Sequence, residues 1–535
     1  MKIFFWVSAR QLIVSSVLPS RGPLFTHVKS VIMNLIVAAA RRTGGIIGRN
    51  NNNEASKHRI TMITSLSTMP SLRSDGDAAT DHIGDDSSSS SSNSMKALWM
   101  PFTPNKLFKS SNTRPRMLSR AKGMYYWTSE NRRILDGTAG LWCSNAGHCP
   151  DYIVEATQRQ LATLDFGPSF LFGHAKAFEY ATRLVAEIAP PNGDLDHVFF
   201  AMCGSTSVDT AMKIALAYHG ARGNASKFRF IGRERGYHGV GFGGISVGGI
   251  PNNRKQYANC LLPGVDHLKS TYHRDQHAYT RGQPSWGAHL ADELQTMIAT
   301  HGASTIAAVI MEPVPGSTGV LPPPAGYLDR IREICTRHDI LLIFDEVITG
   351  FGRLGKGTGS EYFNVTPDLI TCAKGLTNAM IPAGAVFTKG YVYDALMTTT
   401  PRGVPAIELF HGYTYSCHPV AMAAGLATLD YYRDHNLFER ATALSPHFEE
   451  SLHSLKGLPH VIDIRNLGLM GAVELESIPG CAGQRGYELM ERCFEDGVMV
   501  RQTADTIALS PPLIVSKEEV DIIVDTLAKN LRLIE

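Results

Sequence analysis

The sequence predicts an α/β fold, in which a mostly parallel β-sheet lies between helices on both faces. From Met95 onward, short apolar runs rich in β-formers alternate with longer segments that suit helices. Each clear apolar run ends at Gly, Asp, Pro or Lys, which is consistent with short buried strands. Because such sheets collect ligands at the carboxyl ends of their strands, polar residues at those ends are the first candidates for a site.

The clearest elements are four strands and two helices. The strands are predicted at His197–Met202, Ala307–Met311, Ile340–Phe344 and Asp368–Thr371. The helices are predicted at Val208–His219 and Tyr327–His338. No internal repeat is visible, so these elements are expected to form an enzyme core rather than a repeat array.

The composition favours small molecules as partners. The chain has 535 residues, 44% of them hydrophobic, which allows a large buried core. Its net charge of +2 does not indicate nucleic acid or an anionic membrane as the main partner. The 9 cysteines are scattered without a Cys-x-x-Cys pair, which argues against a disulfide framework or a zinc ribbon and favours a reducing compartment. No metal site is predicted.

The N-terminal segment differs from the rest of the chain. Up to Asn53 there is no Asp or Glu, while Lys and Arg punctuate apolar and hydroxyl residues, so a transit peptide for the mitochondrial matrix is expected. The alternatives are a secretory signal peptide, upstream sequence from a mistaken start codon, and a protein of the cytoplasm or another organelle. No membrane span is predicted, since no apolar run reaches about 20 uninterrupted residues. Residues 50–94 are polar and serine-rich, so 1–94 is expected to be a transit peptide and a disordered linker.

Asp345 stands at the end of the buried-looking strand Ile340–Phe344. An ionised carboxylate in that position needs a cation, a metal or several hydrogen-bond donors, because burial without a partner is costly. Taken alone, Asp345 suits a helix N-cap or a buried ion pair as well as a functional role. In the functional interpretation it is the counter-ion of a protonated pyridine nitrogen, whose ring withdraws electrons from a substrate carbon.

Lys374 ends the next predicted strand and is followed at once by Gly375. Burial destabilises an ammonium group and so provides a neutral amine for imine formation. The glycine allows the backbone to turn closely beside a flat ring. A single Ala-Lys-Gly is more often a surface lysine, but its pairing with the Asp345 strand favours a cofactor lysine.

Two further segments suit the binding of a phosphorylated ring. Cys203-Gly204-Ser205-Thr206-Ser207 joins a predicted strand to a predicted helix, where backbone N–H groups and the helix dipole favour an anion. Simple capping by these hydroxyl residues is the alternative, and both can hold together. In Gly232–Gly239, Tyr237 lies between glycines and is available to stack on a ring.

Together these segments resemble, in order and spacing, the class III aminotransferases of the fold-type I pyridoxal 5′-phosphate enzymes, from about Trp99 to the C-terminus. The resemblance is closest to the ω-amino acid (β-alanine):pyruvate branch. The strings that carry it begin at Leu135 (LDGTAGLWC), Glu312 (EPVPGSTGVLPPP), Phe410 (FHGYTYS) and Val500 (VRQTADTI). It implies a large domain with a mostly parallel seven-stranded sheet (151–425), and a smaller α+β domain built from 95–150 and 426–535.

The resemblance also implies roles for individual residues. Lys374 would hold the cofactor as a Schiff base and shuttle a proton, while Asp345 would pair with its ring nitrogen. Its ring would lie between Val347 and Tyr237. Gly204, Ser205 and Thr414 would bind the phosphate, with Thr414 supplied by the other subunit of a homodimer. Arg501 would hold the substrate carboxylate, and Trp142 would form a wall of the substrate pocket. Glu312 would take a supporting position. The homodimer could pair further into a tetramer.

The sequence departs from the family pattern in ways that bear on specificity. Thr206 stands where most relatives have a glutamate, although 4-aminobutyrate enzymes of animals also lack it. Ala325, Ala379 and Ala504 replace the Lys, Gly and Gly that are common in the pyruvate branch, and Ala504 is close to Arg501.

The expected activity is ping-pong transfer of an amino group from an ω-amino acid, such as β-alanine, to pyruvate. The alternatives are a 4-aminobutyrate or taurine aminotransferase, or a racemase, aminomutase or decarboxylating aminotransferase on the same fold. A non-enzymatic dimer kept for binding is the remaining rival. Pyruvate and glyoxylate both stay open as acceptors.

Overall fold

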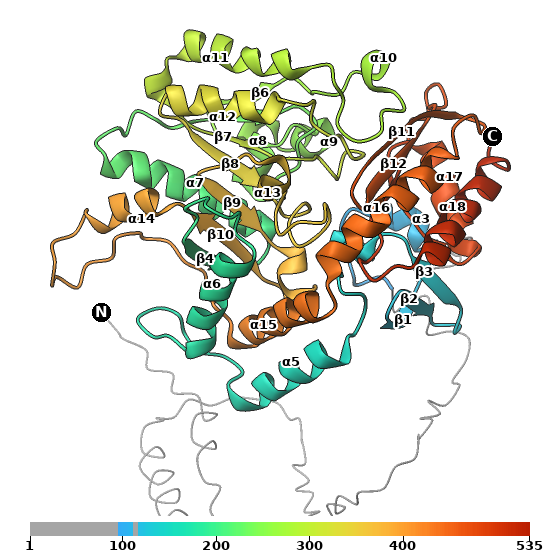
Figure 1. Cartoon of the computed structure of the whole chain (residues 1–535), viewed down its shortest axis with the longest axis horizontal. Helices are drawn as coiled ribbons and strands as arrows, with labels where there is room; N and C mark the ends of the chain where they lie inside the picture. Colours follow the sequence, from blue (N-terminus) through green and yellow to red (C-terminus); the bar gives the residue numbers. More distant parts are fainter. Residues whose placement is uncertain (1–94, 111–115) are drawn as a thin grey trace, which may run out of the picture. The chain divides into compact units, whose positions relative to one another are not determined.

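The computed structural model describes residues 95–110 and 116–535, and the predicted transit peptide and linker at 1–94 lie outside the described residues. A seven-stranded sheet with the order β4-β10-β9-β8-β7-β5-β6 forms the centre of the described chain (Figure 1). Its strands are β4 His197–Ala201, β5 Arg229–Arg233, β6 Val265–Leu268, β7 Ile306–Met311, β8 Leu341–Asp345, β9 Leu369–Cys372 and β10 Gly384–Thr388. The predicted fold class and the four predicted strands are confirmed, within one residue at each strand end.

The strand β10 is the exception to parallel pairing. It runs antiparallel to both of its neighbours, β4 and β9, whereas the other neighbours in the sheet are parallel. The connection from β9 to β10 contains only the short 3-10 helix η4 Lys374–Thr377. A parallel return would need a crossover long enough for a helix, so this short connection produces an antiparallel strand.

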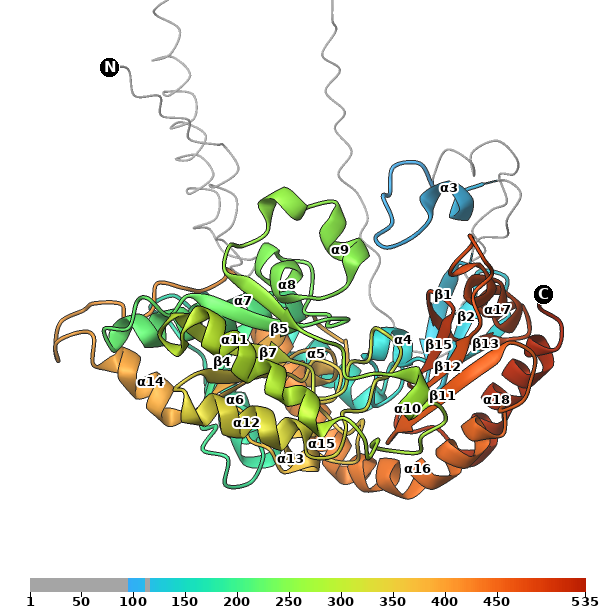
Figure 2. The ribbon, with the colours of Figure 1, turned by 90° about the horizontal axis from the view of Figure 1, so that it is seen from above.

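Alternating side chains of the strands pack against helices on the two faces of the sheet. In β7, Val309 and Met311 belong to one buried cluster, while Ala308 and Ile310 belong to another. The first cluster includes side chains of α6 Ala175–Glu187, α11 Glu293–His301, α12 Tyr327–Arg337 and α15 Pro419–Asp434. The second includes those of α7 Gly204–Ala221, α8 Phe242–Val247 and α14 Gly390–Met397. This period of two explains why β7 is apolar at every position. Figure 2 shows the helices α8 and α12 on opposite sides of the strand β7.

Both predicted helices are present, as α7 and α12. The helix α7 begins four residues earlier than predicted, because the small residues Gly204 to Ser207 form its first turn. The helix α5, Asp151–Thr163, packs against α15. Across residues 95–110 and 116–535, no helix is both long and apolar enough to cross a membrane.

The N-terminal and C-terminal segments form two smaller sheets (Figure 1). The first has the order β1-β2-β3-β13 and the second the order β11-β12-β15-β14. Their strands are β1 Leu118–Lys122, β2 Tyr125–Thr128, β3 Arg133–Asp136, β11 Val461–Leu467, β12 Met470–Leu475, β13 Val498–Met499, β14 Arg501–Thr503 and β15 Thr506–Leu509, accompanied by α16 Leu437–His453, α17 Gln484–Glu495 and α18 Lys517–Leu531. The predicted smaller α+β part therefore joins both ends of the described chain. Its boundary at residue 425 falls inside α15, and the exact domain limits stay predictions.

Candidate active site

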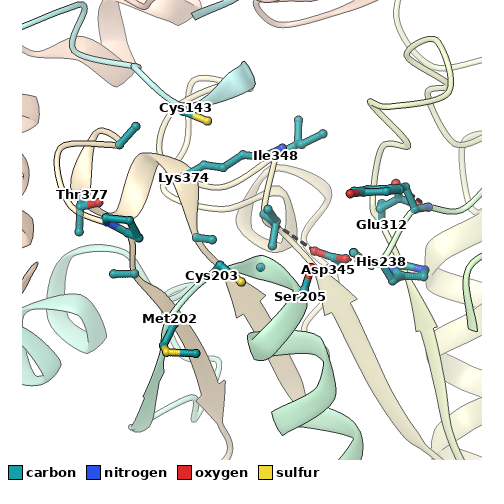
Figure 3. A pocket seen from close by; sticks show the side chains of 18 of the residues that line it. Cys143, Met202, Cys203, Ser205, His238, Glu312, Asp345, Ile348, Lys374 and Thr377 are labelled. Atoms are coloured by element: carbon teal, nitrogen blue, oxygen red, sulfur yellow. Dashed lines mark hydrogen bonds and ion pairs between the residues drawn. The ribbon is translucent and has the colours of Figure 1, made fainter. Parts of the chain in front are cut away.

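A cavity of about 310 Å³ lies at the carboxyl edge of the central sheet (Figure 3). It is lined by the segments that follow β4, β5, β7, β8 and β9, together with the segment that precedes the antiparallel β10. The lining includes the predicted site residues Gly204, Ser205, Tyr237, Asp345, Val347 and Lys374, and also Glu312. Chain segments far apart in sequence meet here because five strand ends share one edge of the sheet.

Lys374 follows β9 and enters the cavity with a backbone φ of 52°, a left-handed conformation that is uncommon for lysine. Among the described residues, no hydrogen-bond or ion-pair partner lies within reach of its Nζ. Burial lowers the pKa of the Lys374 ammonium to about 8; the positive charge of Arg501 acts in the same direction, while Cys143 and Asp345 oppose it. At pH 7 about a tenth of Lys374 is therefore a free amine, far more than for an ordinary lysine with a pKa of 10.5.

Asp345 ends β8 and pairs in register with Thr371 of the neighbouring β9. Its carboxylate is 4% exposed and is held from several directions. Oδ1 accepts hydrogen bonds from Val347 N (3.2 Å) and Thr371 Oγ1 (3.1 Å), and Oδ2 lies 2.8 Å from Nδ1 of His238. The carboxylate is thus fixed at the cavity wall, two residues from Val347 and on the strand beside Lys374.

The N-terminus of α7 lines the cavity next to the Asp345 wall. An added Cβ at Gly204 would lie 3.1 Å from both Cγ atoms of Val347, so a larger residue would close this approach. Ser205 Oγ accepts a hydrogen bond from Val240 N at 3.1 Å, which ties the helix start to the glycine-rich loop after β5. Unpaired N–H groups at the start of a helix, beside a serine hydroxyl, favour a phosphate group.

Thr206 caps this helix in place of the usual glutamate. Its Oγ1 accepts hydrogen bonds from Met202 N (3.0 Å) and Cys203 N (2.9 Å) and donates to Cys203 O (2.9 Å). The glutamate of a capping box satisfies the same N-cap N–H group. The departure noted in the sequence therefore preserves the cap and removes one negative charge from the helix start.

Arg501 lies on β14, beside the same cavity. Its positive charge acts on both Lys374 and Tyr237, and its Nε is buried without a hydrogen-bond partner among the described residues. Burial lowers the pKa of Arg501 from its usual value, although the guanidinium stays charged at neutral pH. A half-buried cation with an unused buried donor suits a carboxylate ligand.

Comparison with known proteins agrees with this geometry. The family profile described as Aminotransferase class-III matches residues 108–531. The chain belongs to the class III aminotransferases. It is 58% identical over 440 residues to the omega-aminotransferase of Caulobacter vibrioides, covering 82% of this chain and 98% of that protein. It is 46% identical over 445 residues to the beta-alanine–pyruvate aminotransferase of Pseudomonas aeruginosa, covering 83% and 97%.

A solved structure extends the comparison to three dimensions. The omega transaminase from Pseudomonas jessenii in complex with PMP has a TM-score of 0.77 and 32% identity, over 83% of this chain and 98% of that one. This class III aminotransferase is therefore an enzyme that depends on pyridoxal 5′-phosphate.

The residues around the cavity fit that cofactor. Lys374 offers a free amine, Asp345 an oriented carboxylate for a cationic ring nitrogen, and the start of α7 donors for a phosphate. Tyr237 and Val347 both line the space between these groups. No group of three or more His, Cys, Asp or Glu that could hold a metal occurs in the described part of the chain.

Three predicted residues do not line this cavity: Arg501, described above, Trp142 and Thr414. Trp142 is 2% exposed and packs in a hydrophobic cluster that contains Ile348, so it lies behind the cavity wall rather than in the lining. Burying the large indole in an apolar cluster removes more surface from water than a place at an open wall would. Thr414 is exposed and does not line the cavity of its own chain. Its predicted contact with the phosphate in a partner subunit stays a prediction.

The sequence interpretation gave no role to His238 and Cys143. His238 is 1% exposed and binds Asp345, and Cys143 lines the cavity near the Lys374 amine. The available signals were positional: His238 directly follows Tyr237, and Cys143 directly follows Trp142. A position next to a predicted site residue does not by itself indicate a role. The role becomes visible only when the fold places the histidine beside a carboxylate or the cysteine beside an amine.

Proposed function

We propose that this aminotransferase moves the amino group of an ω-amino acid, such as β-alanine, to pyruvate. The observation that carries the proposal is the half-buried Arg501 guanidinium, whose buried Nε has no partner among the described residues and whose charge acts on Lys374, because it pairs a carboxylate site with a reactive amine. The two relatives at 58% and 46% identity, named for omega-amino and beta-alanine–pyruvate activity, support the same substrate class.

Lys374, Asp345 and Arg501 each have a separate role in the proposed reaction. Bound pyridoxal phosphate supplies a temporary store for the amino group and an electron sink for the substrate carbon. Lys374 Nζ removes the proton from the amino-bearing carbon and returns a proton later, which its lowered pKa favours. Asp345 stabilises a proton on the ring nitrogen, while Arg501 orients the substrate carboxylate. A ping-pong order follows, because the amino group is stored on the enzyme between the departure of the first product and the arrival of the keto acid.

The test is to add donors singly to purified holoenzyme without any keto acid. β-Alanine, 4-aminobutyrate, taurine and alanine would each be followed by the absorbance of the bound cofactor. The expected result is a change with β-alanine that reverses when pyruvate is added. If only glyoxylate reverses the absorbance change, the acceptor is glyoxylate and not pyruvate. If only 4-aminobutyrate or taurine produces the change, that compound is the donor and β-alanine is not. Turnover of one amino acid without a keto acid would favour a racemase or aminomutase.

A homodimer is the proposed assembly. Leu171, Phe172, Phe410 and Tyr415 are 94%, 71%, 88% and 57% exposed, although each is large and apolar or aromatic. The two segments that carry them meet where the rings of Phe166 and Tyr415 lie 6.0 Å apart. An exposed group of this kind favours an interface with a second copy. Light scattering should give a dimer or a tetramer, and Phe410→Asp should shift it towards the monomer.

Mitochondrial import is the proposed role of the N-terminal segment. The absence of acidic residues up to Asn53 supports it. Residues 1–94 fused to a fluorescent protein should enter mitochondria, and replacing Arg10, Arg21, Arg41 and Arg42 by Glu should abolish import. A diffuse signal from the unaltered fusion would contradict the proposal.

A further inference from the structure

His238 contacts Asp345 and lies next to a second buried acid, Glu312. Its Nδ1 lies 2.8 Å from Asp345 Oδ2, whereas its Nε2 is buried without a partner in the described part of the chain. Glu312 follows β7 and is 5% exposed. One of its oxygens, Oε1, accepts a hydrogen bond from Tyr237 N at 3.3 Å, but Oε2 is buried without a partner among the described residues.

The two unpaired atoms face the same glycine. An added Cβ at Gly236 would lie 3.2 Å from His238 Nε2 and 3.5 Å from Glu312 Oε2. Both unpaired atoms therefore lie close to one point beside the Gly236 Cα, which only a glycine leaves unfilled. Buried polar atoms are rarely left unpaired, because each then loses its hydration without compensation. Figure 3 shows His238 and Glu312 next to each other, with Asp345 beside them.

The charges around this pair favour one extra proton. Asp345 and Glu312 are both acidic, and the fixed positive charge that faces them is Arg233, which is 1% exposed and donates to Glu312 O at 2.7 Å. Tyr237 is the remaining titratable neighbour of Glu312, and Arg501 acts on the ring of Tyr237. Burial raises the pKa of Glu312 to about 7; His238 and Arg233 lower it, and Asp345 raises it. A proton is therefore held here near neutral pH.

We propose that Glu312 is a positioning residue that shares this proton with His238, and that the pair sets the charge that Asp345 presents to the ring nitrogen. With the proton on Glu312, its O–H donates towards Nε2, while Nδ1–H of the neutral His238 donates to the Asp345 carboxylate. Transfer breaks the Glu312 O–H bond, forms Nε2–H and leaves a cationic His238 between two carboxylates. The inference rests on the role of Asp345 as the partner of the ring nitrogen and not on the choice of donor or acceptor.

The matched control is Glu346, another buried acid. It is 0% exposed, and burial raises its pKa to about 7 as well. Its oxygens are already satisfied by Gly359 N, by Ser360 N at 2.7 Å and by Thr349 Oγ1 at 2.9 Å. Glu346→Gln removes a similar buried proton site without touching His238, so it separates a general loss of charge from the proposed relay.

The first measurement is the unfolding free energy of the apoprotein against pH. The folded pKa of Glu312 is about 7, above the ordinary glutamate value of 4.5, so its contribution to stability is present below about pH 4.5 and is lost as pH rises through 7. Glu312→Gln should remove this contribution to the slope of unfolding free energy against pH. It should also remove the infrared carbonyl band of one protonated carboxyl group. An unchanged slope and band in Glu312→Gln would overturn the proposal without involving substrates.

The second measurement is the pH midpoint of the absorbance change of the bound cofactor. Glu312→Gln should lower it by about one pH unit, a tenfold change in proton affinity. Glu346→Gln should leave it in place. In a double-mutant cycle, Glu312→Gln should add nothing to His238→Gln, because the relay passes through His238. Equal shifts in both glutamine variants, or full additivity with His238→Gln, would overturn the proposal.

Discussion

Two regions of the molecule place charged side chains away from water, and they differ in whether the polar atoms of those side chains have hydrogen-bond partners. In the smaller part, Arg465 is 2% exposed and Asp463 is 0% exposed. Arg465 donates to Asp463, to Glu474 Oε2 at 2.6 Å and to Gly319 O at 2.9 and 3.1 Å. Asp463 also accepts from Tyr272 Oη at 2.7 Å. Around the cavity, by contrast, Arg501, His238 and Glu312 each keep a buried polar atom without a partner among the described residues.

Buried polar atoms without partners among the described residues also occur away from the cavity, in Arg132 and His219, so the contrast holds for these two regions and not for every buried charge. The Arg465 cluster satisfies its own hydrogen bonds, so its role is complete in the folded chain. The cavity groups have lost water without gaining partners, which is stable only where the rest of the fold compensates. Substitutions in the two regions should therefore change different quantities: activity at the cavity and stability in the Arg465 cluster.

The largest effect is expected from Lys374→Ala. It removes the proton shuttle and the amine that holds the cofactor, so transamination should fall by about 10³-fold or more. The thermal midpoint of the apoprotein should not fall. Lys374 is partly desolvated and has no partner among the described residues, so its removal takes away no stabilising interaction. Lys213→Ala, at an exposed position on α7, should behave as the wild type. Retention of a full half-reaction would contradict the assignment of Lys374.

Arg465→Met should show the opposite pattern. Leaving Asp463 and Glu474 buried without their cation should cost about 3–5 kcal/mol of unfolding free energy, measured by denaturant titration. The folded fraction should keep a near-normal kcat. A triple variant that also carries Asp463→Asn and Glu474→Gln should recover part of the loss. A selective fall in kcat with unchanged stability would remove the distinction between the two regions.

Arg501→Gln should act on carboxylate binding. Hydrogen bonds to a charged group contribute about 1.5–3 kcal/mol, so KM for the keto acid should rise by about 10- to 100-fold while kcat changes less. An amine donor without a carboxylate provides the control, because its half-reaction should be nearly unaffected. Equal losses for both donors would show that Arg501 supports the site rather than binding the substrate.

The pH dependence of cofactor capture tests the environment of Lys374. With a pKa of about 8, the free-amine fraction, and with it the rate of capture by the apoprotein, should rise about tenfold from pH 7 to 9 and then level off. Stopped-flow absorbance measures this rate. A rate that keeps rising through pH 10, as for an ordinary lysine with a pKa of 10.5, would contradict the burial argument.

The smallest effect is expected from Thr206→Val. Loss of the hydroxyl leaves Met202 N and Cys203 N without their acceptor, which should lower stability by about 1 kcal/mol. Thr206→Glu should retain the cap, because a glutamate at this position can accept the same hydrogen bond. A Thr206→Val protein as stable as the wild type would show that the cap is dispensable.

The central site residues could be predicted from the sequence, whereas the residues that surround them could not. Asp345 and Lys374 were predictable because each ends an apolar strand with a charged residue, a placement that local pattern makes visible. The antiparallel β10 was not predicted, since a period-two apolar run does not specify its direction. Trp142 was placed at the pocket wall from resemblance, whereas packing places it one layer behind, with Ile348.

By itself the sequence determined the strand and helix pattern, the reactive amine, the carboxylate and the anion-binding helix start, because each depends on neighbours within a few residues. Only the tertiary structure decided which of these side chains meet and which buried atoms are left unpaired. His238 lies 107 positions from Asp345 in the chain, and no local pattern indicates that contact. Whether a buried polar atom has a partner depends on groups from several strands at once, so it is a property of the folded sheet edge and not of any one segment.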